Sequence, residues 1–409
     1  MSILNLTEPL VFDNSIESFE YHSYKPYVKS FNFNDEIRIP INQQDLYVLP
    51  SASSLYIEGT ITAFNRETKA EVKSVLFTNN LCQSVTNPIL HLFQDIRYEL
   101  NGIEIDKIKN PGVTTTIKSL VSMNELEASM SKLWGFDVNG TKNTQGTFSV
   151  SVPLNKILGF AEDYNKIIIN CKHELILLRS NTNLNSVKLN ANEYIDNITI
   201  SKIVWRMPHV KVSDRERLNL LKCLERDRAI QIAFRTWDLY EYPLLPETSK
   251  HSWSIKTSSQ IEKPRYVIIG LKTDRKNVAN KDMSHFDHCN LRDVKVFLNS
   301  VYFPYERLDA SFSAEKFAVL YEQYAKFQQS YYNRLQTPLL SPQDFKDIAP
   351  LFVINCSRQN ETLKTGSVDV RVELNCESDI PKNTAAYCLI LNDSVFEYKP
   401  LSNITKKIS

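Results

Sequence analysis

Hydrophobic and polar residues alternate in many short segments along the chain, and a period of two is typical of β-strands with one buried face. Polar stretches rich in Asn, Ser and Pro separate these segments. The predicted strands are residues 35–41, 54–61, 148–152, 167–178 and 198–205 in the first half and residues 265–271, 368–374 and 385–391 in the second. Many strands with little helix predict antiparallel sandwiches.

One strand pair occurs twice, at residues 95–105 (DIRYELNGIEI) and 293–303 (DVKVFLNSVYF), an offset of 293 − 95 = 198 residues. In both copies an alternating strand reaches Leu-Asn, turns at Asn-Gly or Asn-Ser and leaves as a second apolar strand, which predicts a β-hairpin. Only the Asp, the Leu and the Asn are identical. Because the offset is close to half of the 409 residues, the repeat predicts two copies of one β-domain.

A helical pattern follows each hairpin. After the first, apolar residues between Ile117 and Trp134 recur at roughly helical spacing, with Ser and Asn residues among them. After the second, apolar and aromatic residues between Phe317 and Tyr331 recur at steps of three or four, the period of an amphipathic helix packed on a core. The order hairpin, helix, strands therefore recurs in both halves.

The junction between the halves is predicted near residue 213. Ser213 and Glu216 have the spacing of a capping box, and Leu218, Leu221 and Leu224 mark one face of a short helix after it. We therefore expect three parts: an N-terminal sandwich with an N-terminal arm over residues 1–212, a helical connector over 213–229, and a C-terminal sandwich over 230–409.

Four polar stretches, residues 62–80, 135–147, 180–194 and 272–290, are expected to be surface loops. The sequence leaves open whether each is a subunit contact or a solvated connection.

Composition excludes several classes of function. With 42% hydrophobic and 23% charged residues the chain is an ordinary globular protein, and its net charge of +1 without a long basic block argues against a nucleic-acid-binding tail. The nine glycines form neither of the common phosphate-binding loops. Seven cysteines without paired spacing predict buried thiols in a reducing compartment. Without a signal peptide or a membrane-spanning apolar run, we expect the protein to be made and to fold in the cytosol or nucleus.

One cluster has the residue types of a metal site. His285, His288 and Cys289, with Asp282 and Asp287 nearby, are ligand types suited to zinc or iron. No second ligand pair at diagnostic spacing accompanies them, so we expect no metal site there.

Other candidate chemistry is weaker. Cys171 and His173 would share one face of a predicted strand and are most simply sandwich interior. Glu125 and Glu127 form a carboxylate pair on a polar helix and are expected to be solvated. The chain has no Gly-x-Ser-x-Gly nucleophile turn. We therefore expect no catalytic, cofactor-binding or metal-binding residues.

Three further stretches carry a family resemblance: residues 33–47 (FNDEIRIPINQQDLY), 159–164 (GFAEDY) and 327–332 (FQQSYY). Together with the two hairpin-and-helix halves, they make the chain resemble the double jelly-roll major capsid proteins of the adenovirus and tailless-phage lineage, which includes virus-like Polinton elements. The implied fold class is all-β, with two consecutive eight-stranded jelly-roll β-sandwiches and short helices in the loops and at the junction.

The resemblance also implies a function. It implies a major capsid protein that self-assembles as homotrimers of pseudo-sixfold outline into an icosahedral virion shell around a DNA genome. The implied partners are other copies of the chain and minor or penton capsid proteins, without cofactors, catalysis or sequence-specific nucleic-acid binding. Synthesis in the host cytoplasm would precede assembly in the cytoplasm or nucleus. The resemblance leaves open whether an internal membrane lies beneath the shell.

Two other classes stay open from the sequence. One is a binding or structural protein of a host genome, including one descended from a captured capsid gene. The other is a carbohydrate-active enzyme on a β-sandwich scaffold, with two carboxylates facing a cleft. Oligomer size separates the first from a capsid protein, and a competent cleft would indicate the second.

Overall fold

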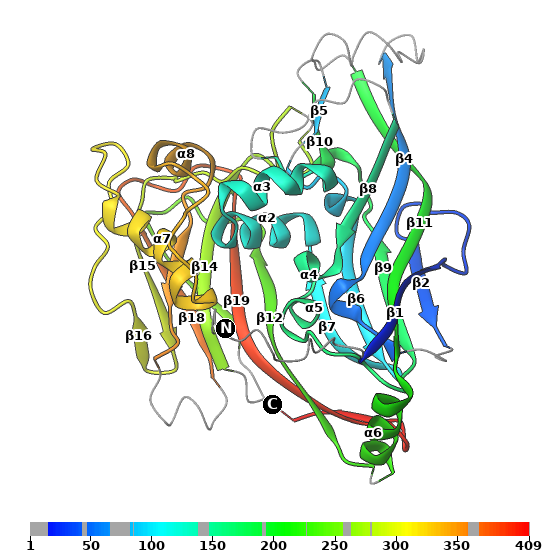
Figure 1. The fold of residues 1–409 in the computed structure, drawn as a ribbon. Coiled ribbons are helices and arrows are strands. Elements are labelled where there is room, and N and C mark those ends of the chain that lie inside the picture. The colour runs from blue at the N-terminus through cyan, green and yellow to red at the C-terminus, as the bar shows by residue number, and fades with distance from the viewer. Residues whose placement is uncertain are drawn as a thin grey trace, which may run out of the picture.

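A computed structural model describes residues 15–42, 47–65, 82–84, 86–137, 147–189, 194–225, 227–256, 263–278, 280–358 and 368–408. Two β-sandwiches stand side by side, with short helices between them and one helix below (Figure 1). The first half of the chain forms one sandwich and the second half forms the other.

The first sandwich has two antiparallel sheets. One contains, in spatial order, β1 (Ile16–Tyr24), β11 (Tyr194–Val212), β4 (Ser54–Asn65) and β8 (Thr147–Pro153). The other contains β2 (Glu36–Ile41), β9 (His173–Arg179), β6 (Phe93–Leu100) and β7 (Ile103–Lys109). The short strand β3 (Tyr47–Val48) pairs with β11, and β5 (Cys82–Ser84) pairs with β10 (Val187–Leu189).

The second sandwich is built in the same way. Its first sheet contains β12 (Ile230–Tyr242), β19 (Thr384–Lys399), β14 (Lys263–Thr273) and β17 (Phe352–Asn355). Its second sheet contains β13 (Lys250–Lys256), β18 (Val370–Cys376), β15 (Leu291–Leu298) and β16 (Val301–Phe303). The strand β20 (Ile404–Lys407) extends the first sheet beside β19.

The two sandwiches share one topology. When the eight main strands of each are numbered in chain order, one sheet reads 1-8-3-6 and the other reads 2-7-4-5 in both halves. This order, with the first and last strands paired and the chain crossing between sheets, is a jelly roll. The predicted fold class, two consecutive jelly-roll sandwiches, is confirmed.

The three residues shared by the repeated hairpins have the same structural roles in both. A β-bulge immediately precedes Asp95 and Asp293 where each strand pairs with its neighbour. Leu100 and Leu298 are fully buried. At the turn, Asn101 has a left-handed backbone (φ 51°) and its side-chain oxygen accepts the N–H of Lys172 at 2.8 Å.

Asn299 repeats that arrangement with φ 55° and accepts the N–H of Asp369 at 2.9 Å. Lys172 and Asp369 each precede the seventh strand of their sandwich, β9 and β18. Asn tolerates the left-handed region better than other residues with a Cβ and can bond with its side chain. The repeat therefore marks the turn that joins the fourth and fifth strands to the seventh.

The helices lie mainly between the fifth and sixth strands. The first sandwich has α2 (Pro111–Ser122) and α3 (Glu125–Ser131) there, and the second has α7 (Ala318–Tyr332) and α8 (Pro342–Ile348). α4 (Leu154–Ile157) and α5 (Gly159–Asp163) follow β8, and α6 (Asp214–Leu224) joins the sandwiches. Short 3₁₀ turns are η1 (Pro50–Ala52), η2 (Leu90–Leu92), η3 (Lys132–Trp134) and η4 (Leu184–Ser186).

Several predicted boundaries differ from the structure. The helical pattern between Ile117 and Trp134 is broken at Asn124, which begins α3 with a capping box to Glu127. Ser213 is the N-cap of α6, but its side chain makes no capping hydrogen bond. The strand predicted over residues 167–178 begins only at His173.

The polar stretch 272–290 is wrongly predicted as a surface loop, because much of it is buried. Lys272, Met283 and Phe286 lie in the interior, and the Lys272 amine donates to the Met283 carbonyl and lies 4.2 Å from the Phe286 ring centroid. Burial lowers the pKa of Lys272 to about 7. The Arg275 guanidinium and the Asp287 carboxylate, 2.6 Å apart, neutralise each other in an ion pair within the same stretch.

The stretch 180–194 also turns inward where it is described, since Ser180, Asn183 and Ser186 are buried. Most of the stretches 62–80 and 135–147 lies outside the described residues.

The two hydrophobic cores interlock. The core of the second sandwich includes four residues of α2, from the first half of the chain: Val113, Ile117, Leu120 and Val121. The core of the first sandwich includes four residues from the second half: Ile232 and Phe234 of β12, and Phe396 and Tyr398 of β19. Each half therefore completes the other's core.

Ile117→Ala tests this exchange. Ile117 is fully buried in the second sandwich's core, so the truncation should lower the free energy of unfolding by about 2–5 kcal/mol. Chemical denaturation with fluorescence measures it, and Leu126→Ala, on an exposed side chain of α3, is the matched control. If both variants leave stability unchanged, the shared core is contradicted.

Candidate functional site at the seam between the sandwiches

The seam between the sandwiches brings several buried or partly buried charged groups together. It begins where α5 lies along the free edge of β12. A Cβ built on Gly159 would lie 1.8 Å from the Arg235 carbonyl oxygen, so only glycine permits this approach.

Asp163, at the end of α5, forms an ion pair with Arg235 of β12 across the seam. The carboxylate accepts the backbone N–H of Arg235 at 2.9 Å, its Nε at 2.8 Å and its Nη2 at 2.5 Å. The guanidinium stacks on Tyr331 of α7, 3.9 Å from the ring centroid. Burial lowers the pKa of Arg235, but the hydrogen bonds and charge of Asp163 outweigh it, so the net shift is upward.

A second charged group lies beside the first. Lys118 of α2 is almost fully buried, and its Nζ lies 2.8 Å from Glu162 Oε2 and 5.2 Å from the Trp237 ring centroid. The Tyr332 hydroxyl donates to Glu162 Oε1 at 2.8 Å. Burial raises the pKa of Tyr332 well above its ordinary value, so the phenol stays a donor.

α7 also satisfies the last carbonyl groups of α2. The Tyr324 hydroxyl donates to the Leu120 carbonyl at 2.8 Å, and Gln328 Nε2 donates to the Met123 carbonyl at 2.9 Å. The end of a helix leaves carbonyls without intrahelical partners, and burying them unpaired would be costly. A helix of the second sandwich therefore caps a helix of the first.

Near these charged groups β7 lies beside β12. A cavity of about 240 Å³ lies between the two sandwiches there. Asp106 lines it and accepts the Phe160 N–H at 2.9 Å. Burial raises the pKa of Asp106 to about 6.

The stretches 159–164 and 327–332, which carry part of the resemblance, supply most of these seam contacts. The individual residues Arg235, Asp163, Lys118 and Glu162 were not singled out from the sequence. Gly159 could have indicated the site from the sequence, because a chain with only nine glycines tends to keep them where the backbone requires one.

The residues whose types would suit a metal site have other roles. The Asp287 carboxylate pairs with Arg275, and His288 stacks on Phe312 and accepts the Asn290 N–H. Cys289 is buried and lies 3.4 Å from the Thr273 hydroxyl. His285 Nε2 lies 3.6 Å from Asp282 Oδ2. Among the described residues, no three His, Cys, Asp or Glu side chains are placed to hold a metal ion.

The other candidate residues are also structural. His173 is fully buried and bonds the Tyr98 hydroxyl at 2.6 Å, and burial lowers the pKa of His173 to about 3. Cys171 is buried just before β9. Glu127 caps α3 and pairs with Arg334 at 2.9 Å, whereas Glu125 is exposed.

The described cysteine thiols share one environment. Cys171, Cys289, Cys356, Cys376 and Cys388 are free and buried. Burial raises the pKa of Cys171 and of Cys376 to about 12 and raises that of the other three as well.

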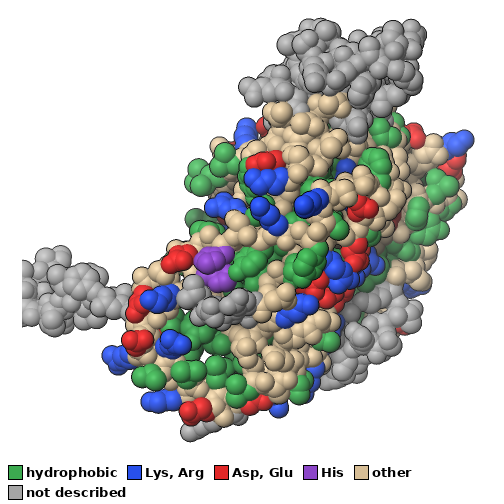
Figure 2. Space-filling view, turned by 90° about the vertical axis from the view of Figure 1, so that its right-hand side faces the viewer, with side chains coloured by type: hydrophobic (Ala, Val, Ile, Leu, Met, Phe, Trp, Pro, Cys, Tyr) green, Lys and Arg blue, Asp and Glu red, His purple; other side chains and the backbone are tan. Residues whose placement is uncertain are grey.

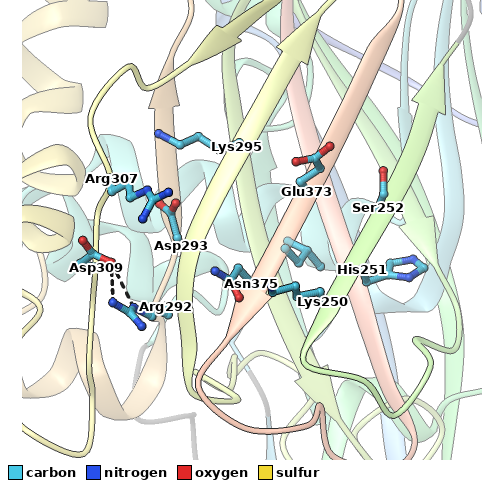
Figure 3. A pocket seen from close by; sticks show the side chains of 11 residues that line it. Lys250, His251, Ser252, Arg292, Asp293, Lys295, Arg307, Asp309, Glu373 and Asn375 are labelled. Carbon is cyan, nitrogen blue, oxygen red and sulfur yellow. Dashed lines mark hydrogen bonds and ion pairs between the residues drawn. The ribbon is translucent and has the colours of Figure 1, made fainter.

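A polar groove of about 620 Å³ lies on the outer face of the second sandwich (Figure 3). It spans β13, β18 and β15 and the segment after β16. Arg292 pairs with Asp309 at 2.9 Å, and the Lys295 amine donates to the Pro304 carbonyl at 2.7 Å. Its charges are spread over an open surface, an arrangement suited to ionic contact with another protein surface.

No helix among the described residues is long and apolar enough to cross a membrane.

Comparison with known proteins identifies a family with this fold. A family profile described as the double jelly roll-like domain matches residues 83–396. A search of curated proteins gave no match.

Solved viral structures share the fold over nearly the whole chain. The Sputnik virophage structure is 10% identical and covers 99% of this chain and 91% of that chain, with a TM-score of 0.66. VP54 of the virus PBCV-1 is 12% identical over 98% of this chain and 99% of that chain, with a TM-score of 0.60. The mavirus major capsid protein is 10% identical over 99% and 92%, with a TM-score of 0.58.

At these identities the structural likeness shows a shared fold, and the family is shown by the profile. That match covers more than half of the 409 residues and agrees with the strand order of both sandwiches. The chain belongs to the double jelly roll-like domain family.

Proposed function

We propose that this chain is a major capsid protein that assembles through homotrimers into an icosahedral virion shell around a DNA genome. The observation that carries the proposal is the seam, which joins two sandwiches of the same topology through shared cores and buried ion pairs. The capsid proteins of PBCV-1, Sputnik and mavirus have the same fold, which supports this role.

Geometry favours a trimer of such chains. Two similar sandwiches in each of three subunits provide six near-equivalent corners, so a threefold object can occupy a sixfold position in a lattice. A seam that held the two sandwiches loosely would not keep the corners in place. Interlocked cores and the Arg235–Asp163 pair supply that stiffness.

We further propose that residues 1–212 and 230–409 act as the two corner units and that residues 213–229 connect them. The role is structural and needs neither cofactor nor catalytic residues. The partners are other copies of the chain in the lattice, together with minor or penton capsid proteins. The site of action is the virion, after synthesis in the host cytoplasm and assembly in the cytoplasm or nucleus.

Light scattering and negative-stain microscopy on the purified chain test the assembly. We expect particles of about three times the 47.2 kDa chain mass, or hollow shells of uniform diameter. A chain that stays monomeric over a wide range of concentration and salt would contradict self-assembly and would favour a binding protein of host origin.

Asp163→Asn tests the stiffness of the seam. It leaves Arg235 without its charge partner, and we expect the free energy of unfolding to fall by about 2–3 kcal/mol, somewhat less than for a fully buried pair because Arg235 is partly exposed. Denaturant unfolding and the yield of uniform particles are the measurements.

The matched control is Glu322→Gln, which breaks the exposed pair Glu322–Lys326 on α7. That change should alter neither quantity. Equal stability of Asp163→Asn and the unsubstituted protein would show that the ion pair does not hold the seam.

A further inference from the structure

The seam inside the chain follows a simple rule: the fifth strand of one sandwich lies beside the first strand of the next. β7 is the fifth strand of the first sandwich and β12 is the first strand of the second. Both are edge strands of their sheets. The free edge of β12 is covered by α5, where the Arg235 N–H finds Asp163. Proteins commonly cover such edges, because an exposed strand edge invites pairing with other chains.

The first strand of the first sandwich, β1, has no such cover within the described ranges. It is hydrogen-bonded to β11 along one edge. It carries three exposed apolar or aromatic side chains, Ile16, Phe19 and Tyr21, with 53%, 45% and 51% of their surface accessible. Figure 2 views the side of the molecule on which β1 lies, where hydrophobic side chains sit among charged ones.

The fifth strand of the second sandwich, β16, is exposed in the same way. It is the edge strand of its sheet and pairs with β15. Tyr302 and Tyr305 are 40% and 87% exposed, and their rings stack at 5.9 Å. By the 198-residue offset Tyr302 is equivalent to Glu104 of β7, which lines the seam cavity beside β12, and Tyr305 follows just after the end of β16.

We propose that β1 of one copy packs against the β16 edge of a second copy, so that the contact between chains repeats the seam within the chain. This inference rests on the proposed trimer and names its contact surfaces. Each chain has one copy of each surface, so the contact is head-to-tail, and it closes into a ring when three chains supply six sandwiches. Exposed aromatic side chains on both surfaces are the residue type that dominates interface energetics.

Both surfaces carry charges of both signs. β1 carries two carboxylates, Glu17 and Glu20, but Glu17 pairs with Lys211 of β11 at 2.8 Å and the Arg206 guanidinium lies 5.2 Å from the Tyr21 ring centroid. The groove beside β16 carries four cations (Lys250, Arg292, Lys295 and Arg307) against three carboxylates (Asp293, Asp309 and Glu373). Lys295 lies 5.5 Å from the Tyr302 ring centroid, which places part of this groove next to the aromatic surface. The exposed aromatic side chains therefore carry the pairing, and the charges around them form the polar rim of such an interface.

Two double variants test the surfaces: Phe19→Ser with Tyr21→Ser, and Tyr302→Ser with Tyr305→Ser. Each should raise the protein concentration needed for half assembly by at least about tenfold, since truncating central aromatic contacts removes much of the binding energy. The matched control is Leu126→Ser with Met130→Ser, two more exposed apolar residues, on α3, which lies away from β1 and β16 in the upper middle of Figure 1; this variant should assemble normally. Thermal unfolding of the monomers checks that all variants fold.

Mixing the two double variants tests whether the two surfaces bind each other. Each retains the surface that the other lacks, so an equimolar mixture should form a dimer of about twice the 47.2 kDa chain mass although each variant alone is monomeric. Trimers that persist in both double variants, or a mixture that stays monomeric, would overturn this interface and leave the trimer standing. A monomeric unsubstituted chain would overturn the trimer itself, and this inference with it.

Discussion

Shared burial of apolar surface across the seam is the constraint on which the rest of this structure depends. α2 leaves its own sandwich to fill the core of the second, and the ends of β12 and β19 fill the core of the first. Neither half of the chain buries its apolar residues completely without the other. The hydrophobic term, which dominates folding, therefore fixes the relative position of the two sandwiches as well as their internal packing.

The polar groups of the seam are a consequence of that burial. Once α2 and α7 are packed together, the carbonyls at the end of α2 and the amine of Lys118 have lost water and need partners, and Tyr324, Gln328 and Glu162 provide them. The close contact of Gly159 with β12 has the same origin. The buried ion pairs thus fix the relative orientation of the two sandwiches at a seam that apolar packing already holds together. The chain can therefore act as one rigid unit.

Local pattern predicted much of the fold and little of the seam. Alternation located eight of the twenty described strands, and the repeated Leu-Asn turn located both hairpins because the same bulge, buried leucine and left-handed asparagine recur. α2 ends at Ser122, and Asn124 begins α3 through a side-chain hydrogen bond that helical periodicity does not reveal. The stretch 272–290 looked exposed because its charges pair with one another inside the fold, and Asp163 and Arg235 lie 72 residues apart, beyond the reach of any local pattern.

The buried cysteines bear on the chemical durability of an assembled particle. The nucleophile in disulfide exchange and in oxidation is the thiolate, which is scarce when the pKa is raised and unreachable when the sulfur is buried. A shell that passes from a reducing cell into an oxidising medium would keep these five thiols unchanged. These five buried residues then add no covalent cross-link to the shell, so the contacts in which they take part can form and separate without an oxidant or a reductant.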